Sequence, residues 1–269
     1  MSVEGFDQTQ FEDALGTWPL YLRGSGPGVV VLHEVPGITD EVARFSRRVA
    51  DAGFTVAMPS LFGQPGVGYT ARPTLSALGR ACIGREFTVL RRGERSPLTD
   101  AMRRLARWLH ARCGGPGVGA IGMCLTGNFA LSMVLDAPVV APVLSQPSLP
   151  FGLSAAHRAD PHLNPGELEA IRDRCAEDGL RILGLRFTHD PLCPGARFET
   201  LRAALGDAFE GVEIPSGPGN PWGLSRTAHS VVTRDLVDEE GHPTQVALER
   251  VLDFFTERLH ASEAPNAPA

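Results

Sequence analysis

Short apolar runs alternate with amphipathic stretches along most of this chain. Runs rich in β-branched residues are typical of strands covered on both faces, and apolar positions recurring every three or four residues indicate helices. Strands are predicted over residues 17–24, 29–32, 54–59, 117–122, 138–144, 180–187 and 209–214. Helices are predicted over residues 40–52, 97–112, 165–178, 195–205 and 244–260, with another directly after Leu125. This alternation predicts an α/β fold with a mostly parallel sheet and helices on both faces.

Three stretches depart from the alternation. Residues 17–24 carry Pro19, which removes a backbone donor and indicates an edge strand. Residues 62–96 lose their periodicity and contain repeated Gly and Pro, so a partly helical cap over a site is expected there. Residues 261–269 read as a flexible tail. With no internal repeat, residues 1–260 are expected to form a single domain.

Composition narrows the classes of function. The 269 residues are 43% hydrophobic and 21% charged, as in an ordinary globular protein, and the formal net charge is −6. This charge argues against nucleic acid or an anionic membrane as a partner. There is no apolar run long enough to span a bilayer and no secretory signal at the N-terminus, so a cytoplasmic location is expected. Five cysteines without C-x-x-C spacing predict neither a disulfide framework nor a zinc site.

The candidate nucleophile is Cys124. It stands at a tight turn between an apolar strand and an apolar helix, which is the context of a nucleophile elbow, G-x-Nu-x-G. Gly122 provides the first small residue, whereas Thr126 meets the second requirement less well. The N–H of Leu125 would point at a developing oxyanion, and the helix N-terminus favours a thiolate. A buried structural cysteine is the alternative on this stretch alone.

Two partners follow in the order expected of an α/β-hydrolase triad. Asp190 comes just after a predicted strand, and His229 lies in a loop after the last strand. Singly, Asp190 before a proline reads as a turn residue and His229 as an exposed loop residue. Together with Cys124 they predict a catalytic triad, in which His229 takes the thiol proton and Asp190 fixes its tautomer.

Four blocks resemble the signatures of the dienelactone hydrolase family over roughly residues 28 to 258. They are Val31-Leu32-His33-Glu34-Val35-Pro36-Gly37, Gly122-Met123-Cys124-Leu125-Thr126-Gly127, His189-Asp190-Pro191-Leu192-Cys193-Pro194 and Ala228-His229-Ser230. The resemblance implies an α/β-hydrolase fold with a small cap, and a Cys-His-Asp triad that opens esters and lactones through a thiol ester. It implies that Glu34 contacts the resting cysteine, and that the Val35 N–H completes the oxyanion hole with Leu125. The implied chemistry requires no cofactor or metal.

The sequence also departs from that family pattern. Glycine is usual where Thr126 stands, so a tighter elbow is expected here. Family members acting on dienelactones hold the substrate carboxylate with two arginines, for which Arg85 and Arg234 are the nearest candidates. Arg234 lies five residues past His229, and a plain surface arginine is an equally good interpretation.

The expected function is a cysteine hydrolase of small-molecule esters or lactones, acting as a monomer or homodimer. Two alternatives stay open, a ligand-binding protein of the same fold that has lost turnover, and a thiol peptidase. The enzyme is favoured because a binding protein has no need to keep Cys124, Asp190, His229 and Glu34 together.

Overall fold

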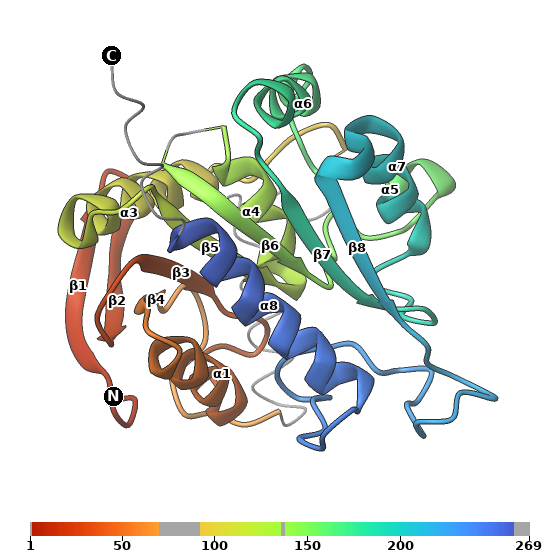
Figure 1. The fold of residues 1–269 in the computed structure, drawn as a ribbon, viewed down its shortest axis with the longest axis horizontal. Coiled ribbons are helices and arrows are strands. Elements are labelled where there is room, and N and C mark those ends of the chain that lie inside the picture. The colour runs from red at the N-terminus through yellow and green to blue at the C-terminus, as the bar shows by residue number, and fades with distance from the viewer. Residues whose placement is uncertain (1, 70–91, 136–137, 261–269) are drawn as a thin grey trace, which may run out of the picture.

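A mostly parallel sheet forms the centre of the molecule. The computed structural model describes residues 2–69, 92–135 and 138–260 (Figure 1). The strands are β1 (Asp7–Asp13), β2 (Gly16–Arg23), β3 (Gly28–Leu32), β4 (Thr55–Pro59), β5 (Val118–Met123), β6 (Val139–Ser145), β7 (Ile182–Phe187) and β8 (Phe209–Ile214). They lie in the order β1-β2-β4-β3-β5-β6-β7-β8, and all neighbours from β4 to β8 are parallel. The predicted α/β class is confirmed.

Helices cover both faces of the sheet (Figure 1). One face carries α1 (Asp40–Asp51) and α8 (Pro243–Leu259), and the other carries α3 (Leu98–Cys113), α4 (Gly127–Met133) and α7 (Gly195–Leu205). Also within the described ranges are α5 (Ala155–Ala159), α6 (Glu167–Glu177), which packs against α7, and the short 3₁₀ turns η1 (Cys124–Thr126) and η2 (Gly206–Ala208). Because β3 and β5 have helices on both sides, every residue in both strands is buried.

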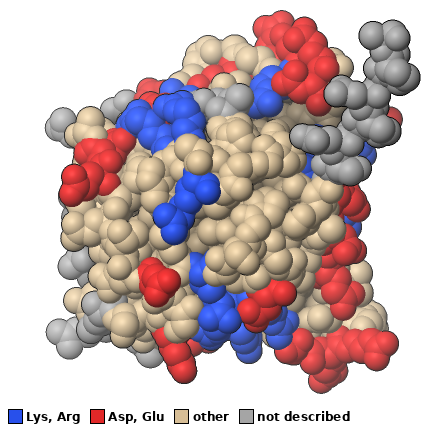
Figure 2. All heavy atoms as spheres, turned by 60° about the vertical axis from the view of Figure 1, so that its left-hand side comes forward, with Lys and Arg blue, Asp and Glu red and all other residues tan. Residues whose placement is uncertain are grey.

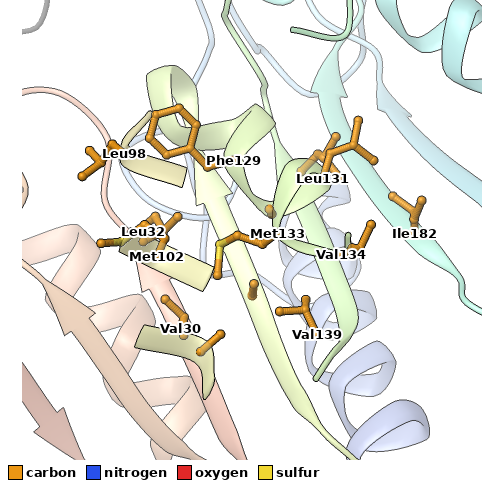
Figure 3. Close-up of a cluster of buried hydrophobic side chains, with 14 of the residues drawn as sticks. Val30, Leu32, Leu98, Met102, Phe129, Leu131, Met133, Val134, Val139 and Ile182 are labelled. Atoms are coloured by element: carbon orange, nitrogen blue, oxygen red, sulfur yellow. The ribbon is translucent and has the colours of Figure 1, made fainter. Parts of the chain in front are cut away.

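Two apolar cores lie on the two faces of the sheet. In the core under α3 and α4, Val30 and Leu32 of β3 meet Met102 and Phe129 from the helices (Figure 3). Each of these side chains is almost fully buried, which stabilises the fold by roughly 1.5–3 kcal/mol per residue. This packing fixes the carboxyl ends of β3 and β5 side by side, where the candidate nucleophile is expected.

The N-terminal edge of the sheet differs from the prediction. Residues 7–13 form β1, an antiparallel partner of β2 that the sequence analysis missed, so β2 is not the edge strand. Pro19 is tolerated inside the sheet because it lies where the ladder to β4 ends: its carbonyl accepts the N–H of Ser60, the residue after β4. The strand could not be recognised from its sequence, because six of the seven residues of β1 are polar and only Phe11 is buried.

Smaller differences concern exposed positions. Trp108, an aromatic residue of α3, is 38% exposed, whereas Met102 and Ala106 belong to the buried face of the helix. Helix α5 interrupts a region predicted to be a loop, and no residue of α5 is buried. Most of the predicted cap, residues 70–91, and the tail at 261–269 lie outside the described residues.

The surface carries charges of both signs. On the side of the molecule that includes β1, Lys and Arg groups lie among Asp and Glu groups and broad uncharged areas (Figure 2). None of the helices within the described ranges is long and apolar enough to cross a membrane.

Candidate active site

Cys124 lies at a strained turn between β5 and α4. Its φ is 56°, a left-handed conformation that is rare for residues other than glycine, and its side chain is almost buried. The surrounding chain holds this conformation, because the carbonyl oxygen of Cys124 accepts the N–H of Ser148 at 3.0 Å. Such strain is typical of residues whose side chains must point out of a turn toward a site.

Close approach of strand and helix explains the glycines of the elbow. A Cβ on Gly122 would lie 2.0 Å from the carbonyl oxygen of Thr126, and one on Gly127 would lie 2.5 Å from Cα of Pro147. Neither position accepts a larger residue without movement of the backbone. The small residues of the motif are therefore required by the way in which the chain crosses itself.

Thr126 fits the elbow because its side chain points away from the crossing. The atom that approaches Gly122 is the carbonyl oxygen of Thr126, whereas the hydroxyl lies 2.9 Å from the carbonyl oxygen of Leu32 at the end of β3. The expectation that a threonine tightens the elbow is therefore not needed: the close approach involves only backbone atoms of residue 126.

Asp190 and His229 form a short, buried pair. Nδ1 of His229 lies 2.6 Å from Oδ2 of Asp190, although the two residues are 39 positions apart. Burial lowers the pKa of the imidazole, but the interactions with Cys124 and with the Asp190 carboxylate outweigh burial and raise this pKa well above 6.5. The other ring nitrogen, Nε2, is buried, and no atom of the described residues lies at a distance and angle that give it a hydrogen bond. Catalytic hydrogen bonds are often long before substrate binds.

Arg186 fixes the loop that carries Asp190. From the end of β7 its guanidinium donates to the carbonyl oxygens of Cys193 at 2.9 Å and Thr188 at 3.0 Å, and it pairs with Glu213 on β8. The two carbonyls flank Asp190 in the chain, so one planar side chain holds both ends of the loop. This role was missed by the sequence analysis, because an arginine inside a buried strand carries no motif.

Asp235 fixes the turn that carries His229. Its Oδ2 atom accepts the backbone N–H groups of His229 at 2.8 Å and Ser230 at 2.9 Å. The carboxylate thus satisfies two donors of the turn directly at the histidine. An aspartate six residues after a loop histidine gives no signal in the sequence, so this residue was also missed.

The carboxylate of Glu34 is buried at 1% exposure among four donors. It accepts hydrogen bonds from Ser230 at 2.7 Å, from Thr233, from the Tyr69 hydroxyl at 2.6 Å and from the Gln146 amide at 3.3 Å. Two of these donors belong to the turn of His229. Among the described residues, the hydrogen bonds of Glu34 thus lead to the histidine turn, to the end of β6 and to Tyr69.

His33 holds the loop that contains Glu34 and Val35. Its Nε2 accepts the N–H of Leu61 at 2.9 Å, so the proton stands on Nδ1, which donates to the Glu34 carbonyl oxygen at 3.0 Å. The ring is fully buried, and burial lowers its pKa to about 4. His33 is therefore neutral at physiological pH and acts as a bridge between two loops.

Of the two arginines that are candidates for holding a substrate carboxylate, only Arg234 lies within the described residues. Arg234 is half exposed, with its guanidinium 5.7 Å from the centre of the Tyr69 ring and 3.8 Å from Asp235. Its position beside the Glu34 network leaves it accessible to a ligand, but no contact distinguishes that role from a surface arginine. Arg85 lies outside the described residues.

Other reactive groups do not gather into a second site. Cys193 is fully buried beside Asp190, and burial raises the pKa of its thiol to about 12. Cys175 is partly buried and its pKa is also raised by burial. Within the described ranges, no three His, Cys, Asp or Glu side chains are placed to hold a metal ion.

Known proteins match this chain in sequence and in fold. A Saccharomyces cerevisiae protein provisionally named a carboxymethylenebutenolidase is 26% identical over 120 residues, which is 43% of this chain and 41% of that protein. A dienelactone hydrolase structure from Anabaena variabilis matches with a TM-score of 0.60 at 15% identity, covering 95% of this chain and all of the other. A dienelactone hydrolase-like promiscuous phosphotriesterase from metagenomic libraries matches with a TM-score of 0.61 at 18% identity, covering 94% and 98% of the two chains.

At these identities the solved structures show a shared fold and no more, and the yeast match spans less than half of either chain. The family model gives the wider match. The model of the dienelactone hydrolase family matches residues 20–259, which include the elbow, the first loop and the segments of Asp190 and His229. Most of the chain is thus covered in order, and the protein belongs to the dienelactone hydrolase family.

Proposed function

We propose that this protein hydrolyses carboxylic esters or lactones of small molecules, with Cys124 as nucleophile, His229 as general base and acid, and Asp190 as the group that orients His229. The observation that carries the proposal is the strained left-handed turn at Cys124 together with the 2.6 Å pair of His229 and Asp190. A cysteine held in strain at a strand end, within electrostatic reach of a paired histidine, is the arrangement that nucleophilic catalysis requires.

The reaction follows from these groups. The thiol proton passes to Nε2 of His229, and the sulfur forms a bond to the carbonyl carbon, whose π electrons move to oxygen. When the carbonyl reforms, the C–O bond to the alkoxide breaks and the alkoxide takes the proton from the imidazolium. Water then attacks the thiol ester and gives a proton to His229. When the carbonyl reforms, the C–S bond breaks and the sulfur takes this proton from the imidazolium, which releases the acid and restores the Cys124 thiol.

Asp190 stabilises the imidazolium that forms twice in this cycle. Its 2.6 Å contact with Nδ1 leaves Nε2 as the atom that exchanges the proton. The raised pKa of His229 has the same cause, since a cation between Cys124 and Asp190 is favoured over the neutral ring. The elbow supplies electrostatic support, because Cys124 precedes α4 and lies at its positive end.

The proposed oxyanion hole consists of the backbone N–H groups of Val35 and Leu125. They stand directly after Glu34 and Cys124, at the carboxyl ends of the adjacent strands β3 and β5. Parallel α/β sheets bind ligands at this edge. Each preorganised donor at the developing oxyanion lowers the activation barrier of acyl transfer by roughly 3 kcal/mol.

Mass spectrometry of the intact protein tests the proposal. Wild-type protein is mixed with a panel of activated esters and lactones and quenched in acid, and we expect an added acyl group on a peptide containing Cys124. Cys124→Ala should lose both the adduct and turnover by more than a thousandfold, while Cys175→Ala, which removes a partly buried thiol on α6, should retain both. An acyl group on another residue, or wild-type turnover in Cys124→Ala, would contradict the assignment.

Thiol labelling provides an independent measure. Iodoacetamide should modify Cys124 ahead of Cys113, Cys175, Cys193 and Cys82, of which the last lies outside the described residues. Cys193 should be slowest, because its thiol is fully buried and has a pKa of about 12. Equal rates at all five thiols would count against an activated nucleophile. Binding of the esters without any turnover would instead favour a ligand-binding protein.

A further inference from the structure

A threonine side chain closes the hydrogen-bond ladder between β3 and β5. The paired register of these strands ends at Leu32 and Gly122. One residue further on, the N–H of Met123 donates to Oγ1 of Thr126 at 3.0 Å, and the same oxygen lies 2.9 Å from the carbonyl oxygen of Leu32. The hydroxyl thus receives a donor from the end of β5 and can give its proton to the end of β3.

The hydroxyl is fully buried and has several backbone acceptors. Besides Leu32, the carbonyl oxygens of His33 at 3.2 Å and Met123 at 3.0 Å lie within reach of its one proton. A hydroxyl can accept from one group while donating to another, so it satisfies the Met123 N–H and one of these carbonyls together. Glycine at this position would leave both backbone groups without that partner.

We propose that Thr126 is a positioning residue that holds the two oxyanion donors at a fixed separation. Leu125, one proposed donor, lies between Met123 and Thr126, and Val35, the other, follows Leu32 by three residues. The hydroxyl therefore joins the chain segments that carry the two N–H groups, one on each side of the gap between the strands. This inference rests on the proposed function, since it concerns the stabilisation of an oxyanion in acyl transfer.

The dependence of catalysis on this contact is steep. Oxyanion donors act only when they lie within hydrogen-bond distance of the oxygen as its charge develops. A displacement of about 1 Å can cost on the order of a hundredfold in rate. Met123 is still paired with Ser145 of β6, but its pairing toward β3 has ended at Gly122, so without the hydroxyl the ladder no longer fixes the distance between the ends of β3 and β5.

Two reactions of the same thiol separate this role from a general structural role. Acylation of Cys124 by p-nitrophenyl acetate passes through a tetrahedral oxyanion and requires both donors. Alkylation by iodoacetamide displaces iodide at a saturated carbon, where no oxyanion forms. The ratio of the acylation rate to the alkylation rate thus reports on the oxyanion hole, and it is insensitive to changes in the amount or ionisation of the thiol.

The experiment compares three proteins with the wild type. Thr126→Val replaces the hydroxyl by a methyl group of similar size, Thr126→Ser keeps the hydroxyl, and Thr55→Val is the matched control. Thr55 is also a buried threonine with a hydroxyl bonded to a backbone carbonyl, that of Gly26 at 2.8 Å, but it lies at the opposite end of the sheet. Acylation is measured in stopped flow and alkylation by mass, with circular dichroism to confirm folding.

We expect Thr126→Val to lower the ratio at least tenfold with little change in alkylation, and Thr126→Ser to restore it to within about twofold. Thr55→Val should leave the ratio unchanged while lowering thermal stability. If Thr126→Val does not fold, Thr126→Ala provides the same comparison.

An unchanged ratio in Thr126→Val, or an equal loss in Thr126→Ser, would overturn the positioning role. Failure of the proposed function gives a different result, because wild-type protein would then be alkylated normally and would not be acylated at all.

Discussion

The hydroxyl of Ser230, the residue after His229, donates a hydrogen bond to Oε2 of Glu34 over 2.7 Å. Thr233, from the same turn, donates to the other carboxylate oxygen. Each of the two carboxylate oxygens of Glu34 thus accepts a hydrogen bond from a side chain of the histidine turn. The family resemblance points to a different contact, between this glutamate and the resting thiol, and the two roles predict different behaviour.

If Glu34 anchors the histidine turn, removing its donors should act like removing its charge. We expect Glu34→Gln and the double variant Ser230→Ala/Thr233→Val both to lower kcat by about tenfold, since either change loosens the turn that carries His229. Alkylation of Cys124 in the absence of substrate should not become faster in either variant. Turnover and iodoacetamide labelling, measured between pH 5 and 9, check both statements.

A different outcome would favour protection of the thiol. In that case Glu34→Gln removes a carboxylate that opposes the thiolate, and Cys124 becomes more readily alkylated and oxidised. The double variant would leave labelling unchanged, because it retains the carboxylate.

The pKa of His229 gives the pH dependence of catalysis. The protonated imidazole is favoured by Cys124 and Asp190, so its pKa is raised above 6.5. Because this pKa is higher in the folded protein than in the unfolded chain, the protonated ring stabilises the fold. This stabilisation is fully present below pH 6.5 and is lost as the pH rises through the raised pKa. Because the leaving alkoxide takes its proton from the His229 imidazolium, we expect the alkaline limb of kcat/KM to lie above pH 6.5, and Asp190→Asn to move it to lower pH.

Removing the thiol should have a similar effect on the histidine itself. In Cys124→Ala the titration midpoint of His229, followed by NMR of the ring protons, should fall relative to wild type. Cys175→Ala, on α6, should not move it. A midpoint independent of residue 124 would show that Cys124 and His229 do not interact.

Arg186 should matter for catalysis without touching the reacting groups. Lysine cannot reproduce the three contacts of its guanidinium with Cys193, Thr188 and Glu213, so Arg186→Lys should loosen the Asp190 loop. We expect a loss of roughly tenfold in kcat, or about 1.4 kcal/mol, with the alkaline limb moved to lower pH as in Asp190→Asn.

Arg202→Lys is the control, because Arg202 also pairs with Glu213 but from the exposed side of α7. Equal losses of kcat in the two arginine variants would show that catalysis depends on the ion pair with Glu213. The hydrogen bonds from Arg186 to the loop carbonyls would then have no separate effect.

The parallel part of the fold was accessible from sequence because its strands are buried on both faces. Surface loops do not contain continuous apolar runs such as those of β3 and β5. The strand β1 was missed for the opposite reason: six of its seven residues are not buried, so its polar sequence resembles a surface loop. A strand with a single buried residue has too few apolar positions for its alternation of apolar and polar residues to be recognised.

The candidate site divides in the same way. Cys124, Asp190 and His229 stand in motifs whose order along the chain is constrained by the fold, and they could be named in advance. Arg186 and Asp235 act through bonds to backbone carbonyls and N–H groups. Such bonds depend on the path of the chain and place little constraint on neighbouring residues, so they leave no pattern in one sequence.

His33 predicts a pH dependence of stability opposite in sign to that of His229. Its fully buried ring has a pKa near 4, below the ordinary value of 6.5, because burial disfavours the charged form. The stabilisation from the neutral ring is therefore fully present above pH 6.5. As the pH falls toward 4 the unfolded chain gains a proton that the folded protein does not, at a cost of about 3 kcal/mol in the free energy of unfolding.

The variant His33→Asn should lack this dependence. At pH 7 it should be less stable than wild type, because the bridge from Leu61 to the Glu34 carbonyl is lost. Between pH 6.5 and 4.5 the difference should shrink, since only wild type loses stability through residue 33. The contribution of His229 is common to both proteins and cancels in the difference. Urea unfolding at each pH measures this difference, with His157→Asn, at a half-buried histidine of α5, as control. A difference independent of pH would show that His33 is not the buried neutral bridge described above.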